Sequence, residues 1–238
     1  MTKTQKFLKN IQAISIAPPE NIIRILELID NNKPITFFSW KMFGIKMTQK
    51  GLIANPSFDT DEADKYIIKE KNFIKTLLKL EINFKYIKLI PNELPKVFFG
   101  VNLPKESTSF AVNVSRYFKK IYPKTKVIKL SELLSNRPLA LVYKKAFAQG
   151  QSESIDPKKF AKEKLSRSTY YSDEPLSNEK GTILAQKAFG LFSAETAIIF
   201  KYITNPVLLA GARSIDTYKY KFSKYPKDRP ILPILFVL

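Results

Sequence analysis

The chain has 238 residues, of which 45% are hydrophobic and 13% aromatic, so it carries enough apolar material for one sizeable core. Its 40 Lys and Arg against 21 Asp and Glu give a formal net charge of +19, an excess that indicates a polyanionic partner such as RNA. The complete lack of cysteine and histidine excludes disulfides, thiol nucleophiles, Cys- or His-ligated metals and Ser-His-Asp triads.

The positive charge has a second interpretation, because Lys far outnumbers Arg, a bias also typical of organisms whose proteins are Lys-rich throughout. No stretch reaches the roughly 20 apolar residues that a membrane span needs, and the N-terminus has no signal-peptide core before Pro18. We therefore expect a soluble, cytoplasmic protein that needs no cofactor and no metal and does not bind a membrane. The oligomeric state stays open.

Hydrophobic periodicity predicts helices and strands that alternate along the chain. The first predicted helix follows Pro18 and Pro19 and is ended by Asn31 and Asn32. The predicted elements after it are, in order, strand 34–39, a loop over 43–58, helix 60–80, strand 84–90, helix 108–122, strand 126–130, a short helix from 131, helices 138–149, 157–167 and 182–203, and strands 207–210 and 231–237. Strands separated by helices are typical of a parallel sheet with right-handed crossovers. We predict a single α/β domain over 1–238, with a Rossmann-like, mostly parallel sheet of about five strands, helices on both faces, and a basic N-terminal helical segment over 1–30.

Ser39 ends the first long predicted strand. In open parallel sheets, ligands bind beyond the carboxyl ends of the strands, so this hydroxyl lies where a substrate is expected. A serine at this position also serves simply to cap or turn the chain, and both interpretations stay open. No G-x-G-x-x-G or Walker pattern follows a strand, so neither a dinucleotide nor a nucleoside triphosphate is expected.

Helix 182–203 carries a carboxylate on its apolar face, since Glu195 follows Leu191 by one turn of the hydrophobic stripe. A carboxylate in such a place is costly unless it is paired or hydrogen-bonded. Glu195 is therefore a candidate for holding an ammonium group or moving a proton. The alternative is a structural ion pair, for instance with Arg213.

Cations gather in two segments, one between 111 and 130 that has no acidic residue and one over 157–167 whose single acid is Glu163. Clustered, flexible cations suit contacts with phosphate groups, although a solvated helix face has the same composition. The residues that we predict to contact RNA are Lys119, Lys120, Lys158, Lys159, Lys162 and Arg167.

Three segments of the second half, LFSAE at 191–195, NPVLL at 205–209 and SIDTY at 214–218, are similar to the tRNA-dependent cyclodipeptide synthases. A fourth, KVIKLSELL at 126–134, resembles a strand and an "LSEL" segment of the same family. The resemblance implies a fold like that of class I tRNA synthetases. It also implies that the chain takes two aminoacyl-tRNAs and joins their amino acids into a diketopiperazine.

The resemblance further implies roles for particular residues. Ser39 matches the serine that accepts the first aminoacyl group, Glu195 the glutamate that binds its amino group and assists proton transfer, and Tyr218 the tyrosine that completes the pocket. Family members usually have Gly, Asn and Tyr at three nearby positions where this chain differs. The residues at these positions, together with one neighbour, are expected to contact the substrate: Phe37, Met42, Leu191 and Phe192.

An aminoacyl ester is already activated, so its transfer to a serine requires no ATP, metal or histidine base. That chemistry agrees with the composition. Two other functions stay open. One is a non-catalytic RNA-binding protein on a Rossmann-like scaffold, and the other is a small-molecule transferase that holds a phosphorylated substrate at the carboxyl edge of the sheet.

Overall fold

Helices and strands alternate along the chain, as the hydrophobic periodicity predicted. The structure is a computed structural model that describes residues 1–12, 15–16, 19–40, 45–48, 51–54, 60–90, 113, 116–152, 178–211 and 233–237. Its labelled elements are α1 (Lys3–Gln12), β1 (Ser15–Ile16), α2 (Pro19–Asp30), β2 (Ile35–Trp40), β3 (Ile45–Thr48), β4 (Gly51–Ala54), α3 (Thr60–Lys79), β5 (Phe84–Ile90), β6 (Lys126–Lys129), α6 (Leu130–Leu134), α7 (Arg137–Ser152), α9 (Asn178–Tyr202), β7 (Pro206–Gly211) and β8 (Ile234–Val237).

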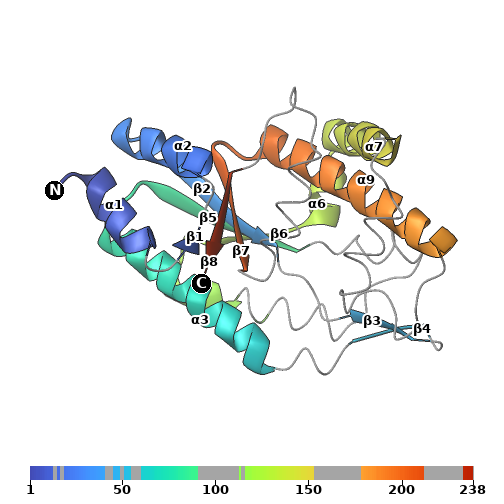
Figure 1. Cartoon of the computed structure of the whole chain (residues 1–238), viewed down its shortest axis with the longest axis horizontal. Coiled ribbons are helices and arrows are strands. Elements are labelled where there is room, and N and C mark those ends of the chain that lie inside the picture. Colours follow the sequence, from blue (N-terminus) through green and yellow to red (C-terminus); the bar gives the residue numbers. More distant parts are fainter. Residues whose placement is uncertain are drawn as a thin grey trace.

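A six-stranded sheet in the order β1-β8-β7-β2-β5-β6 lies at the centre of the molecule (Figure 1). The strands β8, β7, β2, β5 and β6 run parallel, and the two-residue β1 pairs antiparallel with β8 at one edge. β2 is central, because it pairs with β5 on one side and with β7 on the other. The predicted Rossmann-like, mostly parallel sheet is therefore confirmed.

The two faces of the sheet are covered by different helices. The ring of Phe37 on β2 lies 5.3 Å from that of Phe73 on α3 and 6.2 Å from that of Phe84 on β5, so α3 covers the face to which Phe37 points. The connection from β2 through α3 to β5 crosses the sheet in one direction, and the connection from β6 through α9 to β7 crosses it in the opposite direction. Because such crossovers are right-handed, α9 lies on the face opposite to α3. Figure 1 shows α3 and α9 on opposite sides of the strands, which confirms helices on both faces.

Two local features differ from the sequence-based expectation. The segment 43–58 was predicted as a loop, but β3 and β4 within it pair as an antiparallel hairpin, with Ile45 opposite Ala54. The N-terminal segment 1–30 was predicted as helical, but β1 separates α1 from α2. These strands are short, and such short strands exist only through their pairing partners, which periodicity does not reveal.

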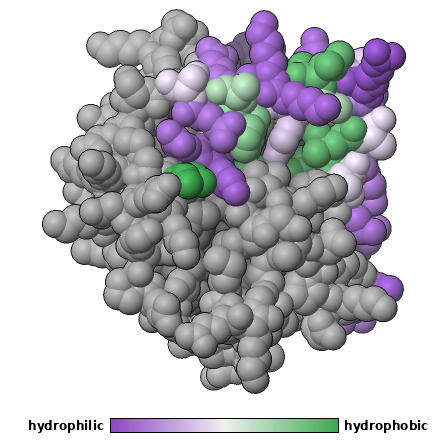
Figure 2. Space-filling view, turned by 90° about the vertical axis from the view of Figure 1, so that its right-hand side faces the viewer, coloured by the Kyte–Doolittle hydropathy of each residue, from purple (hydrophilic) through white to green (hydrophobic). Residues whose placement is uncertain are grey.

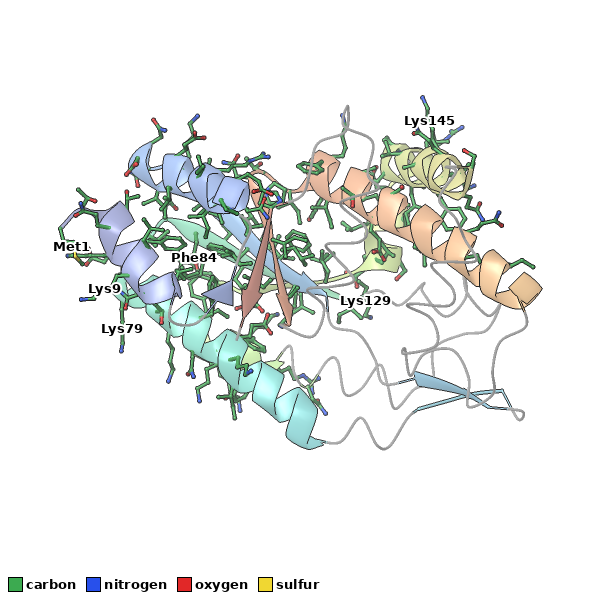
Figure 3. All side chains as sticks on the ribbon, viewed as in Figure 1. Met1, Lys9, Lys79, Phe84, Lys129 and Lys145 are labelled. Carbon is green, nitrogen blue, oxygen red and sulfur yellow. The ribbon has the colours of Figure 1, made fainter. Side chains whose placement is uncertain are left out.

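α1 docks onto the main core through one side. Phe7 and Ile11 are fully buried, whereas Lys3, Lys6 and Lys9 on the remaining surface of the helix are exposed. Figure 3 shows Lys9 directed away from the body of the protein and Phe84 inside it. The amphipathic pattern of this basic segment therefore serves to pack it onto the domain.

The side of the molecule that carries α7 and α9 is mixed in character. Figure 2 shows hydrophobic side chains among hydrophilic ones near its top. Leu141 on α7 and Ile183 on α9 are among the large hydrophobic side chains that are exposed. No helix in the described part of the chain combines the length and the apolarity that crossing a membrane requires.

Phe37, which was expected to contact a substrate, lies in the core because strand alternation turns its ring toward α3. We expect Phe37→Ala to lower the free energy of unfolding by about 3–5 kcal/mol, the usual cost of deleting a buried aromatic ring. Urea denaturation measures this change. Ile23→Ala on the exposed side of α2 is the control, with an expected change within about 0.5 kcal/mol. A small effect of Phe37→Ala would contradict the core assignment.

Candidate active site

A polar cluster lies between the sheet and α3, close to the carboxyl end of β2. Ser39 is the next-to-last residue of β2 and stands opposite Lys88 of β5 in the strand register. Both side chains point to the α3 face, because side chains two residues apart on a strand share a face and Phe37 points there. Glu70 of α3 and Tyr86 of β5 complete the cluster, and all four residues have 0% of their surface exposed.

Hydrogen bonds join the four side chains into a ring in which each contacts two others. The Nζ atom of Lys88 lies 2.7 Å from Ser39 Oγ and 2.5 Å from Glu70 Oε2. The hydroxyl of Tyr86 lies 3.2 Å from Ser39 Oγ and donates to Glu70 Oε1. Each polar group therefore has a partner, as burial in an apolar surrounding demands.

Aromatic rings enclose the amine of Lys88. Its Nζ atom lies 4.2 Å from the ring centre of Phe118 and 5.5 Å from that of Tyr86, distances at which a cation is attracted to a ring face. Burial lowers the pKa of the Lys88 ammonium below its ordinary value, while the charge and the hydrogen bond of Glu70 oppose this shift. The cluster thus places a lysine of reduced basicity within hydrogen-bond distance of a serine hydroxyl.

A serine beside such a lysine is one of the arrangements that activate a hydroxyl for nucleophilic attack. A buried ion pair with a purely structural role is the other interpretation of the same geometry. The described residues contain no group of His, Cys, Asp and Glu side chains suited to holding a metal ion. The chemistry that the four side chains themselves offer is proton transfer and acyl transfer.

Sequence reasoning found Ser39 but missed its partners. Glu70 shares the helical spacing of Phe73 and Leu77 on the buried side of α3, which is the same signal that singled out Glu195. Lys88 belongs to the strand sequence FKYIKLI, two residues after Tyr86 and four after Phe84. Residues two apart on a strand share a face, so this spacing predicts that Lys88 points inward with the two aromatic residues. Both signals were present in the sequence, but neither says that the two residues face each other.

Of the other residues predicted for the site, some lie on α9 and some lie outside the described part of the chain. The hydrophobic stripe predicted Glu195 on the apolar face of its helix. In the structure Glu195 lies on α9 and is only half-buried, whereas Ala194 and Ile198 on the same helix are buried. Leu191 is buried on the same helix, and Phe192 also lies on it. Met42 and Tyr218 lie outside the described residues.

Ser39 therefore points to the α3 face, and Glu195 belongs to the helix on the other side of the sheet. Within the described part of the chain, Ser39 Oγ is hydrogen-bonded to Lys88 and Tyr86. The predicted meeting of Ser39, Glu195 and Tyr218 in one cavity stays a prediction, since Tyr218 lies outside the described residues.

A basic surface lies directly outside this cluster. Lys119 and Lys120 are exposed on the helical turn 116–121, whose buried member Phe118 supplies the ring against Lys88. The Nζ atom of Lys71 lies 5.9 Å from the ring centre of Tyr117, so this turn and α3 are neighbours. We call six of the cations of these two elements the basic face: Lys71, Lys75, Lys79, Arg116, Lys119 and Lys120.

Figure 3 shows Lys79, on the basic face, directed outward from α3. The second predicted RNA-binding segment, with Lys158, Lys159, Lys162 and Arg167, lies outside the described residues. The role of these four residues stays a prediction.

The sequence matches no protein-family model and no curated protein. Among solved structures, the chain is similar to tyrosyl-tRNA synthetase from Archaeoglobus fulgidus, with a TM-score of 0.56, 13% identity, and coverage of 100% of this chain and 64% of that one. It is also similar to tyrosyl-tRNA synthetase from Leishmania major, with a TM-score of 0.53, 10% identity, and coverage of 100% and 36%. AlbC, a cyclodipeptide synthase from Streptomyces noursei, aligns with a TM-score of 0.44, 12% identity, and coverage of 86% and 95%.

The first two likenesses show that this chain shares the α/β fold of these tyrosyl-tRNA synthetases. The chain spans 64% of the length of one of these synthetases and 36% of the other. At such identities the shared property is the fold, and a fold of this kind hosts many chemistries.

A double-mutant cycle tests whether the buried pair is coupled. We expect Glu70→Leu and Lys88→Met each to lower the free energy of unfolding by about 3–5 kcal/mol, because each leaves one buried ionisable group without its partner. The double variant should be about as stable as the wild type, since it removes both desolvated charges. Urea denaturation of the four proteins measures the coupling, and additive destabilisation in the double variant would contradict it.

Proposed function

We propose that this chain is an aminoacyl-tRNA-dependent aminoacyltransferase in which Ser39 accepts an aminoacyl group and a second aminoacyl-tRNA completes a cyclic dipeptide. The observation that carries the proposal is the contact of 2.7 Å between Ser39 Oγ and the buried Lys88 amine, at the carboxyl end of the central strand. The fold shared with tyrosyl-tRNA synthetases and the residues similar to cyclodipeptide synthases support it.

The proposed reaction exchanges ester and amide bonds without any redox change. Ser39 Oγ attacks the carbonyl carbon of the aminoacyl ester, the bond to the tRNA ribose breaks, and the ribose hydroxyl recovers a proton. The amine of the bound residue then attacks the carbonyl carbon of the second aminoacyl ester, the bond to the second tRNA breaks, and the ribose hydroxyl of that tRNA recovers a proton. The new terminal amine attacks the carbonyl carbon of the ester on Ser39, which closes the ring, breaks the bond to Ser39 Oγ and restores the serine hydroxyl. As the resemblance implies, Glu195 and Tyr218 are proposed to hold the amino groups during these steps. Glu195 would have to reach the substrate beyond the carboxyl edge of the sheet, because α9 lies on the face opposite to the one to which Ser39 points.

The basic face supports the same proposal. A tRNA must place its acceptor end at the reacting serine while its phosphates lie outside. Lys119 and Lys120 belong to the helical turn whose Phe118 ring packs against the Lys88 amine. Exposed cations are therefore direct sequence neighbours of a residue that contacts the cluster. Flexible lysines in such a place suit phosphate contacts, whatever the sequence of the RNA.

One observation favours the second candidate, a non-catalytic RNA-binding protein. Ser39 has 0% of its surface exposed, which is what a structural hydrogen-bond network between sheet and helix requires. Acyl transfer instead requires that the substrate carbonyl reach Ser39 Oγ. The two candidates therefore differ in a measurable property, which is the accessibility of this hydroxyl to acyl donors.

Covalent capture separates the two candidates. We expect the wild-type chain, mixed with a pool of aminoacyl-tRNAs, to gain the mass of an aminoacyl group on the peptide containing Ser39, and the solution to accumulate diketopiperazines. Both signals should vanish in Ser39→Ala, because alanine provides no oxygen for the ester. Intact-protein and small-molecule mass spectrometry provide the measurements. Absence of both signals from a folded wild-type protein would contradict the proposed acyl transfer and favour a function that does not use aminoacyl-tRNA as an acyl donor.

Charge reversal on the basic face tests RNA binding. We expect the double variant Lys119→Glu/Lys120→Glu to bind tRNA more weakly and to flatten the log–log salt dependence by about 0.7–0.9 for each phosphate that is no longer neutralised. Lys144→Glu/Lys145→Glu is a matched control, because this exposed pair lies on α7, away from α3 (Figure 3). Gel-shift titrations across salt concentrations measure both effects. Equal weakening in the two variants would mean that net charge alone, and no particular face, attracts RNA.

A further inference from the structure

If Ser39 accepts an acyl group, a base near its hydroxyl must remove the hydroxyl proton. A serine hydroxyl is a weak nucleophile until a neighbouring base takes its proton, and this chain has no histidine to do so. The hydroxyl has two described partners, the amine of Lys88 at 2.7 Å and the phenol of Tyr86 at 3.2 Å. The amine is the nearer of the two, and in its neutral form it is a far stronger base than a neutral phenol.

We propose that Lys88 is the general base that removes the proton of Ser39, and that Glu70 positions Lys88 through its hydrogen bond to the amine. The identity of the acyl donor rests on the proposed function, whereas the pairing of base and nucleophile rests on the contacts of Ser39, Lys88 and Glu70.

Burial explains how Lys88 can be neutral. Each charge of the pair has lost its water, which costs several kcal/mol per ion even after the protein relaxes. The loss of water disfavours the charged ammonium form of Lys88, and Glu70 remains hydrogen-bonded to its amine. The lowered pKa of Lys88, caused first by burial, agrees with this direction.

The proposed step conserves both protons and bonds. The neutral amine of Lys88 takes the proton of Ser39 Oγ while this oxygen forms a bond to the carbonyl carbon of the donor ester. The bond between that carbon and the leaving oxygen breaks, and the Lys88 ammonium returns a proton to the leaving alkoxide. The exchange of one ester for another changes no oxidation state.

Four described segments surround the Lys88 amine. β2 contributes the Ser39 hydroxyl, α3 contributes the Glu70 carboxyl, β5 contributes the Tyr86 phenol, and the 116–121 turn contributes the ring of Phe118. Tyr86 donates to Glu70, so it helps to hold the carboxylate that is hydrogen-bonded to the Lys88 amine.

The test uses a fluorophosphonate ester, which reacts with activated serines and needs no tRNA, on the full-length chain. We expect Ser39 to be labelled at a rate that rises with pH and levels off below the ordinary pKa of a lysine. Lys88→Met should lower that rate by about 10² or more, the usual contribution of a general base. The matched control is Lys85→Met, an exposed lysine on the same strand, which should react like the wild type. Peptide mass spectrometry locates the label, and circular dichroism confirms folding.

A second variant keeps the amine and changes its basicity. Because the chain has no cysteine, Lys88→Cys creates a unique thiol, which 2-bromoethylamine converts to a lysine analogue that is less basic than lysine. We expect this alkylated protein to recover labelling of Ser39, with the midpoint of its pH profile shifted downward. A merely structural lysine would not move the midpoint.

Three results would overturn the assignment. They are a wild-type Ser39 that is not labelled at any pH, a Lys88→Met variant labelled at the wild-type rate, and an unshifted midpoint in the alkylated Lys88→Cys protein. The outcome is distinct from that of the acyl-transfer experiment. Labelling that depends on Lys88, without any ester from aminoacyl-tRNA, would keep the base and nucleophile and reject the proposed substrate.

Discussion

The burial of one ion pair between the sheet and α3 constrains the centre of this protein. Glu70 and Lys88 are fully enclosed, and their charges are compensated by each other and by the hydroxyls of Ser39 and Tyr86. Such a pair is costly to bury, and a well-packed apolar replacement is often equally stable or more stable. The proposed acyl transfer would give this pair, at the carboxyl end of the central strand, a chemical role that stability alone does not require.

The pair also ties together the elements around it. The register between β2 and β5 places Ser39 beside Lys88. The packing of α3 on these strands brings Glu70 into contact with Lys88. The turn that contains Phe118 closes the cluster on one side and exposes Lys119 and Lys120 on the other. A basic outer surface and a polar interior thus share the same short segment, so a polyanion bound outside would lie next to the buried cluster.

The likeness to tyrosyl-tRNA synthetases concerns the arrangement of the strands and helices. In folds of this kind the chemistry resides in side chains at the carboxyl edge of the sheet, and these vary independently of the scaffold. Ser39, Lys88 and Glu70 lie close to this edge, and the proposed reaction uses neither histidine nor metal. The fold therefore defines the class of scaffold, whereas the proposed activation of a nucleophile depends on the cluster.

The sequence by itself determined the alternation of helices and strands, the mostly parallel sheet, and the position of Ser39 at the carboxyl edge, because these follow from local periodicity and from the rules of parallel connections. Only the tertiary structure decided that Ser39 faces α3 and not α9, that Phe37 belongs to the core, and that Glu70 meets Lys88. A period of two fixes which residues of a strand share a face, but it does not say which helix covers that face. The pairing of a helix residue with a strand residue depends on register and packing between distant segments, and a single sequence does not encode these in any local pattern.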